Sequence, residues 1–163
     1  MLRVLLNDLT ANTSRILKKY NDESLPYVSG LEIAGPSIYN VCPGKVVAVG
    51  QESNKTYAVT IFINNNQMIR YTNLEYADVK VGQQLTFRDY IGRCKKFVRL
   101  EYCTPNKGHS IWPVRIDDIT MYKHDPEGLI TGSIKLKVYY GGYEDPSSIT
   151  DSALYELSDN RGE

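Results

Sequence analysis

Short stretches of alternating apolar and polar residues, separated by turn residues, fill the region from Leu31 to Tyr102. In Tyr57–Ile63, every second side chain would lie on the same face of a strand, because successive residues of a strand point to opposite faces. Three consecutive asparagines, 64–66, follow this stretch, and Gln67–Tyr71 resumes the strand-like pattern. Because asparagine is favoured in tight turns, this arrangement predicts a β-hairpin. The region as a whole predicts a mainly antiparallel β domain.

Further strands are expected at Lys45–Val49, Gln84–Phe87, Phe97–Cys103, Val114–Tyr122 and Ser133–Tyr140. His124–Gly128 is expected to be the turn that joins the last two strands into a C-terminal β extension. Residues 2–19 carry leucine and isoleucine at spacings that suit one face of a short N-terminal helix. We therefore predict a helical arm over 1–24, a β domain over 25–112, and a β hairpin with a polar tail over 113–163.

The charges of the chain balance, with 19 Lys and Arg against 19 Asp and Glu among 163 residues. A neutral chain gives no electrostatic reason to expect nucleic acid or an anionic membrane as the main partner. The chain has no run of 18 apolar residues, so the sequence contains no candidate transmembrane helix. Its first residues lack the apolar core and cleavage site of a secretory signal. We therefore expect synthesis in the cytoplasm, with neither a nucleic-acid nor a membrane partner.

The cysteines and histidines show no catalytic or metal-binding spacing of their own. Cys42, Cys94 and Cys103 form neither a CxxC pair nor a Cys/His zinc pattern. We expect three reduced, buried thiols, because free cysteine packs as a small apolar residue. His109 and His124 are expected to be exposed loop residues, and no Ser-His-Asp arrangement or glycine-rich phosphate loop is present.

Six motifs of the β region follow one another in a fixed order. They are Val28-Ser29-Gly30-Leu31-Glu32, Gly44-Lys45-Val46, Tyr71-Thr72-Asn73-Leu74, Val79-Lys80-Val81-Gly82-Gln83, Ile91-Gly92 and Phe97-Val98-Arg99-Leu100-Glu101. This succession resembles the His-x-Gly-x-Asp, Gly-x-Val, Tyr-x-His-Leu, Val-x-x-Gly-Gln, Ile-Gly and His-x-His-Phe-Glu motifs of the lysostaphin-type zinc endopeptidases, which cleave peptidoglycan cross-bridges. The resemblance extends from Tyr27 to Tyr102 and implies an antiparallel, barrel-like metallopeptidase-type β domain.

The positions that hold zinc ligands and catalytic histidines in that family carry other residues in this chain. By the resemblance, the ligand positions correspond to Val28, Glu32 and Arg99, and the catalytic histidines to Asn73 and Phe97. A catalytic zinc ion needs lone pairs from three protein ligands. Valine offers none, and a guanidinium group has no acceptor. Asparagine and phenylalanine do not transfer protons near neutral pH. We therefore predict no metal or other cofactor, and no enzyme activity.

The resemblance places a vacated active-site groove at these five positions. Tyr71, Tyr76 and Trp112 are candidate contacts to a ligand in the groove, and core or rim packing is the alternative for each. An ion pair between Glu32 and Arg99 across the groove is a further hypothesis, with two separately solvated side chains as its alternative.

We interpret the chain as a non-catalytic structural or assembly protein of a bacteriophage tail or baseplate, because folds of this family occur in such machines. The expected location is the virion tail, and the expected partners are other tail or baseplate proteins, with a homo-oligomer also considered. The alternatives are a module that binds peptidoglycan without cutting it, and an active endopeptidase whose ligand positions are aligned differently.

Overall fold

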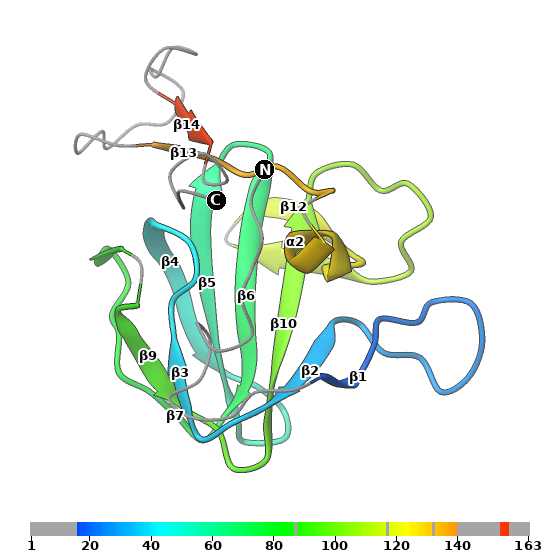
Figure 1. Cartoon of the computed structure of the whole chain (residues 1–163), viewed down its shortest axis with the longest axis horizontal. Helices are drawn as coiled ribbons and strands as arrows, with labels where there is room; N and C mark the ends of the chain where they lie inside the picture. The colour runs from blue at the N-terminus through cyan, green and yellow to red at the C-terminus, as the bar shows by residue number, and fades with distance from the viewer. Residues whose placement is uncertain (1–15, 87, 117, 132, 140–153, 157–163) are drawn as a thin grey trace.

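The computed structural model describes residues 16–86, 88–116, 118–131, 133–139 and 154–156, and strands dominate this part of the chain (Figure 1). The larger sheet consists of β1 (Ile16–Lys18), β2 (Leu31–Ala34), β4 (Gly44–Gln51), β5 (Tyr57–Asn64), β6 (Gln67–Leu74), β8 (Gln84–Leu85), β10 (Phe97–Thr104), β11 (Pro113–Ile116) and β12 (Ile119–His124). A smaller sheet consists of β3 (Ser37–Tyr39), β7 (Tyr76–Ala77) and β9 (Tyr90–Arg93). The remaining elements are α2 (Glu127–Thr131), β13 (Lys137–Tyr139) and β14 (Leu154–Glu156).

The larger sheet runs in the order β1-β2-β10-β6-β5-β4-β8, and its neighbouring strands pair antiparallel. The strands at its two ends, β1 and β8, do not pair with each other, so the sheet is open and not a closed barrel. The mainly antiparallel β class predicted from the sequence is confirmed. No helix in the described ranges is long and apolar enough to cross a membrane.

The hairpin predicted from the three asparagines is confirmed by the pairing of β5 with β6. Asn64 and Gln67 are register partners at its turn, and the Asn64 Oδ1 accepts a hydrogen bond from the Asn66 N–H at 2.8 Å. Along β6, Ile69 and Tyr71 point into the main core, whereas Arg70 between them points to the opposite face. The period-two pattern thus fixes which face of the sheet each side chain occupies.

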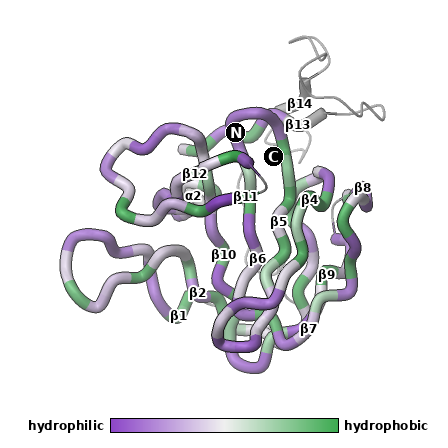
Figure 2. Tube along the Cα trace, turned by 180° about the vertical axis from the view of Figure 1, so that it is seen from behind, coloured by the Kyte–Doolittle hydropathy of each residue, from purple (hydrophilic) through white to green (hydrophobic). Residues whose placement is uncertain are grey.

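The main hydrophobic core lies between the larger sheet and the smaller one. Figure 2 shows hydrophobic residues concentrated along the central strands. Leu31, Ile61 and Leu100 of the larger sheet pack with Ile38 and Ile91 of the smaller sheet, and all five are fully buried. Burying a side chain of this size contributes about 1.5–3 kcal/mol, so this layer supplies most of the stabilisation that holds the two sheets together.

The three cysteines are free and buried, as the sequence analysis predicts. Cys42 and Cys94 belong to the main core. Cys103 belongs to a smaller cluster on the opposite face of the larger sheet, with Met68 and Met121. Burial raises the pKa of each thiol, since a thiolate loses its hydration when it is enclosed by apolar groups.

The prediction of an N-terminal helix over residues 2–19 is wrong for the last residues of that range. Ile16–Lys18 form β1, which pairs antiparallel with β2. The β-branched Ile16 packs against the main core as part of this strand, so tertiary pairing outweighs the helical spacing of the segment. Residues 1–15 lie outside the described part of the chain.

The predicted C-terminal hairpin has a different arrangement from the expected one. Pro113–Ile116 and Ile119–His124 are two strands that pair with each other, and β12 also pairs with β10. The short helix α2 follows β12 where a turn was expected, with the Glu127 N–H donating to the Asp125 Oδ1 at 2.9 Å. β13 pairs with β14 from the region predicted to be a polar tail. Strands from each of the three predicted parts, β1, β10 and β12 among them, thus join one sheet.

Candidate functional site

Four of the five predicted groove positions meet where β2, β10 and β6 lie side by side. Arg99 on β10 has Glu32 on β2 and Thr72 on β6 as register partners. The Arg99 guanidinium donates to the Glu32 Oε2 from Nη2 at 2.9 Å and from Nε at 3.3 Å. The Glu32 side chain is 7% exposed and that of Arg99 is 29% exposed. The hypothesis of an ion pair between Glu32 and Arg99 is therefore confirmed.

Asn73 and Phe97 complete this cluster. Asn73 has a φ of 66°, a left-handed conformation that asparagine adopts more readily than most residues. Its Nδ2 donates to the Phe97 carbonyl oxygen at 3.0 Å, which links β6 to the start of β10. The Cζ of Arg99 lies 5.6 Å from the centre of the Phe97 ring, within the range of a cation–π interaction. Neighbouring strands thus gather Glu32, Asn73, Phe97 and Arg99 into one group of contacts.

Val28 reaches this region through the segment that leads into β2. Val28 is 9% exposed, and its backbone N–H and C=O both bond to Asn21 at 2.9 Å. Two residues later, Gly30 lies against β10. A Cβ at Gly30 would stand 2.4 Å from the Leu100 carbonyl oxygen and 2.9 Å from the Arg99 Cγ. Only glycine permits this close approach of the two backbones.

The residues at the positions that the resemblance assigns to a zinc ion do not fit one. Val28 and Arg99 offer no lone pair, and one oxygen of the Glu32 carboxylate already accepts both bonds from Arg99. A dication would also meet the positive charge of the guanidinium. Within the described ranges, no three His, Cys, Asp or Glu side chains gather closely enough to share a metal ion.

A buried ion-pair network centres on Glu101, which lies two residues after Arg99 on the same face of β10. The Glu101 carboxylate, 1% exposed, accepts from the Arg70 Nη1, from the Lys123 Nζ at 2.9 Å and from the Ser29 Oγ at 3.0 Å. These partners come from β6, β12 and the segment before β2. Because a buried charge is tolerated only with partners, the network joins four parts of the chain. The charged residues at 70 and 101 inside apolar strands were a sequence signal for this network, which was not predicted.

Tyr71 is a core residue, so its prediction as a groove contact is wrong. Its side chain is fully buried, and its hydroxyl donates to the Asn40 Oδ1 at 2.9 Å while accepting from the Val41 N–H at 3.1 Å. Burial raises the pKa of this hydroxyl above its ordinary value. The apolar environment and the two hydrogen bonds explain why the ring faces inward: Tyr71 follows Ile69 on the core side of β6.

Tyr76 and Trp112 lie apart from each other in the fold. Tyr76 is on β7 of the smaller sheet, is 44% exposed, and its hydroxyl is 2.8 Å from that of Tyr90. Trp112 precedes β11 and makes an edge contact with Tyr20, with ring centres 5.3 Å apart. The structure therefore does not gather the three predicted aromatic contacts around Arg99.

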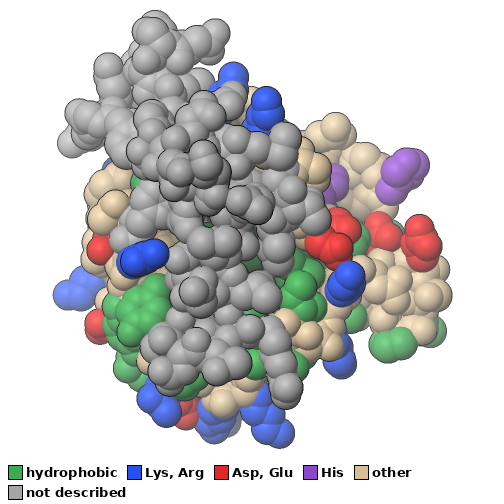
Figure 3. All heavy atoms as spheres, viewed as in Figure 1, with side chains coloured by type: hydrophobic (Ala, Val, Ile, Leu, Met, Phe, Trp, Pro, Cys, Tyr) green, Lys and Arg blue, Asp and Glu red, His purple; other side chains and the backbone are tan. Residues whose placement is uncertain are grey.

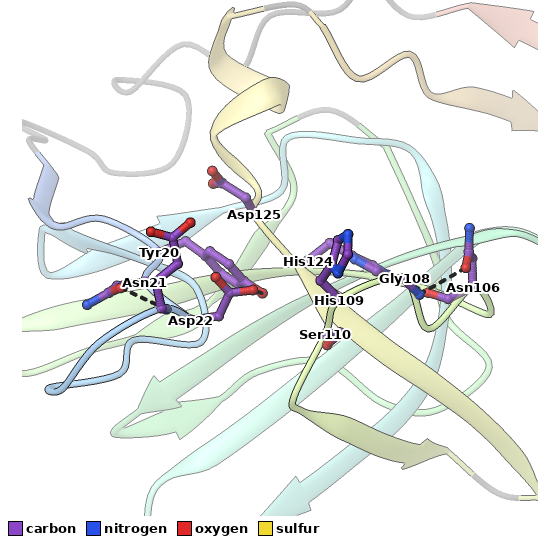
Figure 4. Close-up of a pocket in the computed structure, with 10 residues that line it drawn as sticks. Tyr20, Asn21, Asp22, Asn106, Gly108, His109, Ser110, His124 and Asp125 are labelled. Atoms are coloured by element: carbon purple, nitrogen blue, oxygen red, sulfur yellow. Dashed lines mark hydrogen bonds between the residues drawn. The ribbon is translucent and has the colours of Figure 1, made fainter.

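A polar hollow of about 610 Å³ opens elsewhere, between the segment before β2 and the loop after β10 (Figure 4). Tyr20 and Asp22 line one side, and His109, His124 and Asp125 line the other. None of the eight sequence-predicted site residues lines this hollow. His109 is exposed as expected, whereas His124 ends β12 and its Nε2 lies 2.6 Å from the Asn106 carbonyl oxygen.

No protein-family model matches the sequence, and no curated protein matches it either. Solved structures do match. Lysostaphin from Staphylococcus simulans, an antimicrobial peptidase, superposes with a TM-score of 0.57 at 15% identity, covering 89% of this chain and 60% of its own. The catalytic domain of a prophage-encoded M23 protein, EnpA from Enterococcus faecalis, superposes with a TM-score of 0.55 at 16% identity, covering 70% of this chain and 89% of its own.

The chain has the lysostaphin-type fold. A chain of the SpoIIQ–SpoIIIAH pore-forming complex shares this fold, with a TM-score of 0.57, 14% identity, and coverage of 80% of this chain and 92% of its own. The chain spans only 37% of the length of another similar structure, a zinc-containing peptidase from Vibrio cholerae. The lysostaphin-type fold thus occurs both in peptidases and in a complex of two proteins, and these identities establish the fold alone.

Proposed function

We propose that this chain is a non-catalytic structural or assembly protein built on the lysostaphin-type fold, and that it belongs to a bacteriophage tail or baseplate. The observation that carries the proposal is the Glu32–Arg99 ion pair. It occupies two of the positions where the resemblance expects zinc ligands, and its donors leave no arrangement of lone pairs for a metal ion. Without that ion, the fold offers shape and surface to its partners.

Two of the similar structures support this direction. One comes from a pore-forming complex, which shows that a chain with this fold assembles with another protein. The other is prophage-encoded, which agrees with a phage setting for the fold. The partners in our proposal are other tail or baseplate proteins, and its location is the virion tail.

The proposal predicts that the purified chain neither binds zinc at one ion per chain nor clears a suspension of cell walls. Elemental analysis after incubation with zinc and dialysis measures the first, and loss of turbidity measures the second, with lysostaphin as the positive control. Retention of one zinc ion per chain together with loss of turbidity would refute the proposal and favour the endopeptidase alternative.

The assembly role predicts a stable complex when the chain is co-expressed with the proteins encoded beside it. Size-exclusion chromatography with light scattering measures the mass of such a complex. Saturable binding to purified cell wall, without any complex, would favour the peptidoglycan-binding module instead. Tyr76, which is exposed, and Trp112, which is half-buried, are the first residues to change in that case, because Tyr71 is enclosed in the core.

A further inference from the structure

Two loops project from the same end of the larger sheet, and both carry exposed large apolar side chains (Figure 1). The first loop, 19–30, precedes β2, and the second, 105–112, follows β10. Leu25 and Tyr27 on the first loop are 79% and 47% exposed, and Ile111 on the second is 48% exposed. A single exposed apolar residue is ordinary, but several on adjoining loops are typical of an interaction surface.

Aromatic contacts hold these loops together. Trp112 meets Tyr20 edge-on at 5.3 Å and an interplanar angle of 77°, and it meets Tyr27 edge-on at 6.3 Å and 80°. Leu25 and Ile111 are close sequence neighbours of these rings. We call the four residues Leu25, Tyr27, Ile111 and Trp112 the loop-tip surface. Because its rings are fixed by one another, little conformational freedom is lost when a partner covers it.

The polar hollow adjoins the loop-tip surface through Tyr20, which lines the hollow and contacts Trp112. Three carboxylates, those of Asp22, Glu23 and Asp125, line it, and no lysine or arginine is among its described lining residues. Within the described part of the chain, none of the three is in an ion pair. Figure 3 shows acidic and histidine side chains gathered where the loops project.

Two neighbouring groups bear on the charge of the hollow. The Tyr20 hydroxyl donates to the Asp22 Oδ2 at 3.3 Å, and burial together with the carboxylates of Asp22 and Asp125 raises its pKa. Lys123, next to His124 in the chain, does not neutralise the hollow, because its ammonium group bonds to Glu101 at 2.9 Å.

We propose that the hollow and the loop-tip surface together dock a lysine-bearing segment of a partner protein. The lysine ammonium enters the hollow, whose lining includes three carboxylates. An apolar neighbour of the lysine covers the loop-tip surface. A hollow of about 610 Å³ is large enough for such a side chain. Large exposed apolar side chains favour a protein partner, because short cell-wall peptides of small residues would leave them uncovered. This inference rests on the proposed assembly function and specifies the chemistry of the partner.

The test titrates the tripeptide acetyl-Leu-Lys-Leu-amide into the ¹⁵N-labelled full chain and follows amide shifts by NMR. We expect shifts confined to the two loops and to residues 124–125, with millimolar affinity. The same peptide with norleucine in place of lysine is the neutral control. Its affinity is expected to be at least about fivefold lower, since it lacks the cation.

Matched variants test whether the carboxylates of the hollow bind the lysine tripeptide. Asp22→Asn combined with Asp125→Asn removes two charges while keeping the oxygens that accept from Tyr20 and from the Glu127 N–H. We expect its affinity for the lysine tripeptide to fall about five- to tenfold. Asp118→Asn is the control, since Asp118 is exposed outside the hollow and makes only a 4.0 Å contact with Arg115. Its affinity should equal that of the wild-type chain.

Several outcomes would overturn the inference. These are equal binding of the norleucine peptide, an unchanged affinity of the double variant, or no binding of the lysine tripeptide at all. Shifts caused by peptidoglycan fragments but not by the tripeptide would assign the surface to cell wall. A dimer in sedimentation analysis that Leu25→Ser dissociates would assign it to a second copy of the chain. A chain that clears cell walls yet binds the tripeptide here would keep this site and lose only the proposed function.

Discussion

Replacing Glu101 with glutamine tests the buried ion-pair network directly. Glutamine keeps the shape of the side chain but removes the charge that Arg70 and Lys123 share. Glu101 is 1% exposed, and the side chains of Arg70 and Lys123 are 10% and 17% exposed. Breaking a buried pair by removing one partner costs about 3–5 kcal/mol, because the remaining charge stays desolvated without compensation.

The lower end of that range applies to this chain. Glu52, 39% exposed, lies 3.9 Å from the Arg70 Nη2 and retains part of the compensation. We therefore expect Glu101→Gln to lower the free energy of unfolding by about 3 kcal/mol. With a urea dependence of about 2 kcal/mol per molar, the unfolding midpoint falls by about 1.5 M. Urea denaturation followed by circular dichroism measures it.

The exposed pair of Lys19 and Glu127 provides the control. Their charged atoms are 3.4 Å apart, but their side chains are 68% and 32% exposed. Glu127→Gln is expected to change the free energy of unfolding by less than about 1 kcal/mol, because solvent screens such a pair. A Glu101→Gln variant as stable as this control would refute the reasoning.

A triple variant separates the charge effect from packing. Arg70→Met with Glu101→Leu and Lys123→Met removes every charge of the network and replaces it with apolar groups of similar size. It is expected to recover most of the stability lost in Glu101→Gln, since the cost of desolvation disappears with the charges. If the triple variant is less stable than Glu101→Gln, the network itself is a net source of stability.

Four more predictions concern the buried parts of the fold. Tyr71→Phe leaves the Val41 N–H and the Asn40 Oδ1 without a buried partner and should lower the free energy of unfolding by about 1–3 kcal/mol, as urea denaturation would show. Gly30→Ala places a Cβ 2.4 Å from the Leu100 carbonyl oxygen and should cost at least about 1–3 kcal/mol, whereas alanine at Gly50, where nothing lies within 4 Å, is the steric control. The thiols should react with Ellman's reagent only after unfolding; rapid labelling of the native chain would contradict their burial. Burial raises the pKa of Cys94 to about 11 and of Cys103 to about 12 from an ordinary 9.0, so the folded state holds these protons more tightly. Their contribution to stability is intact below pH 9 and is lost as pH rises through 11 to 12, which urea midpoints across that range would reveal.

Local patterns were sufficient to predict the strands at the centre of the fold. The alternation in 57–63 and the asparagines that follow specify a hairpin through backbone geometry alone. The Asp117-Asp118 pair was an equally local turn signal between two apolar stretches. The prediction of one strand over 114–122 did not take it into account and was wrong, since two strands pair there. The pairing of β13 with β14 had no such signal, because its partner lies in a polar region far along the chain.

The contacts of the candidate site depend on which strands become neighbours. The motif order placed Glu32 and Arg99 in one site, and their register pairing across β2 and β10 confirms that part. Single-sequence patterns do not reveal that β10 lies between β2 and β6, so they left Glu101 without its partners. The hollow could not be predicted for the same reason: Asp22 and Asp125 are distant in sequence and line one hollow only because the fold brings their segments together.

The cross-strand pair of Glu32 and Arg99 also limits how such a chain could change during evolution. Exchanging Arg99 alone for histidine would strip a 7% exposed carboxylate of its guanidinium, before Val28 had become a residue with a lone pair. This first step toward a metal-binding descendant therefore produces a less stable intermediate, and selection for a folded protein would act against it. The pair thus makes an exchange of Arg99 costly for a chain in which Glu32 stays buried.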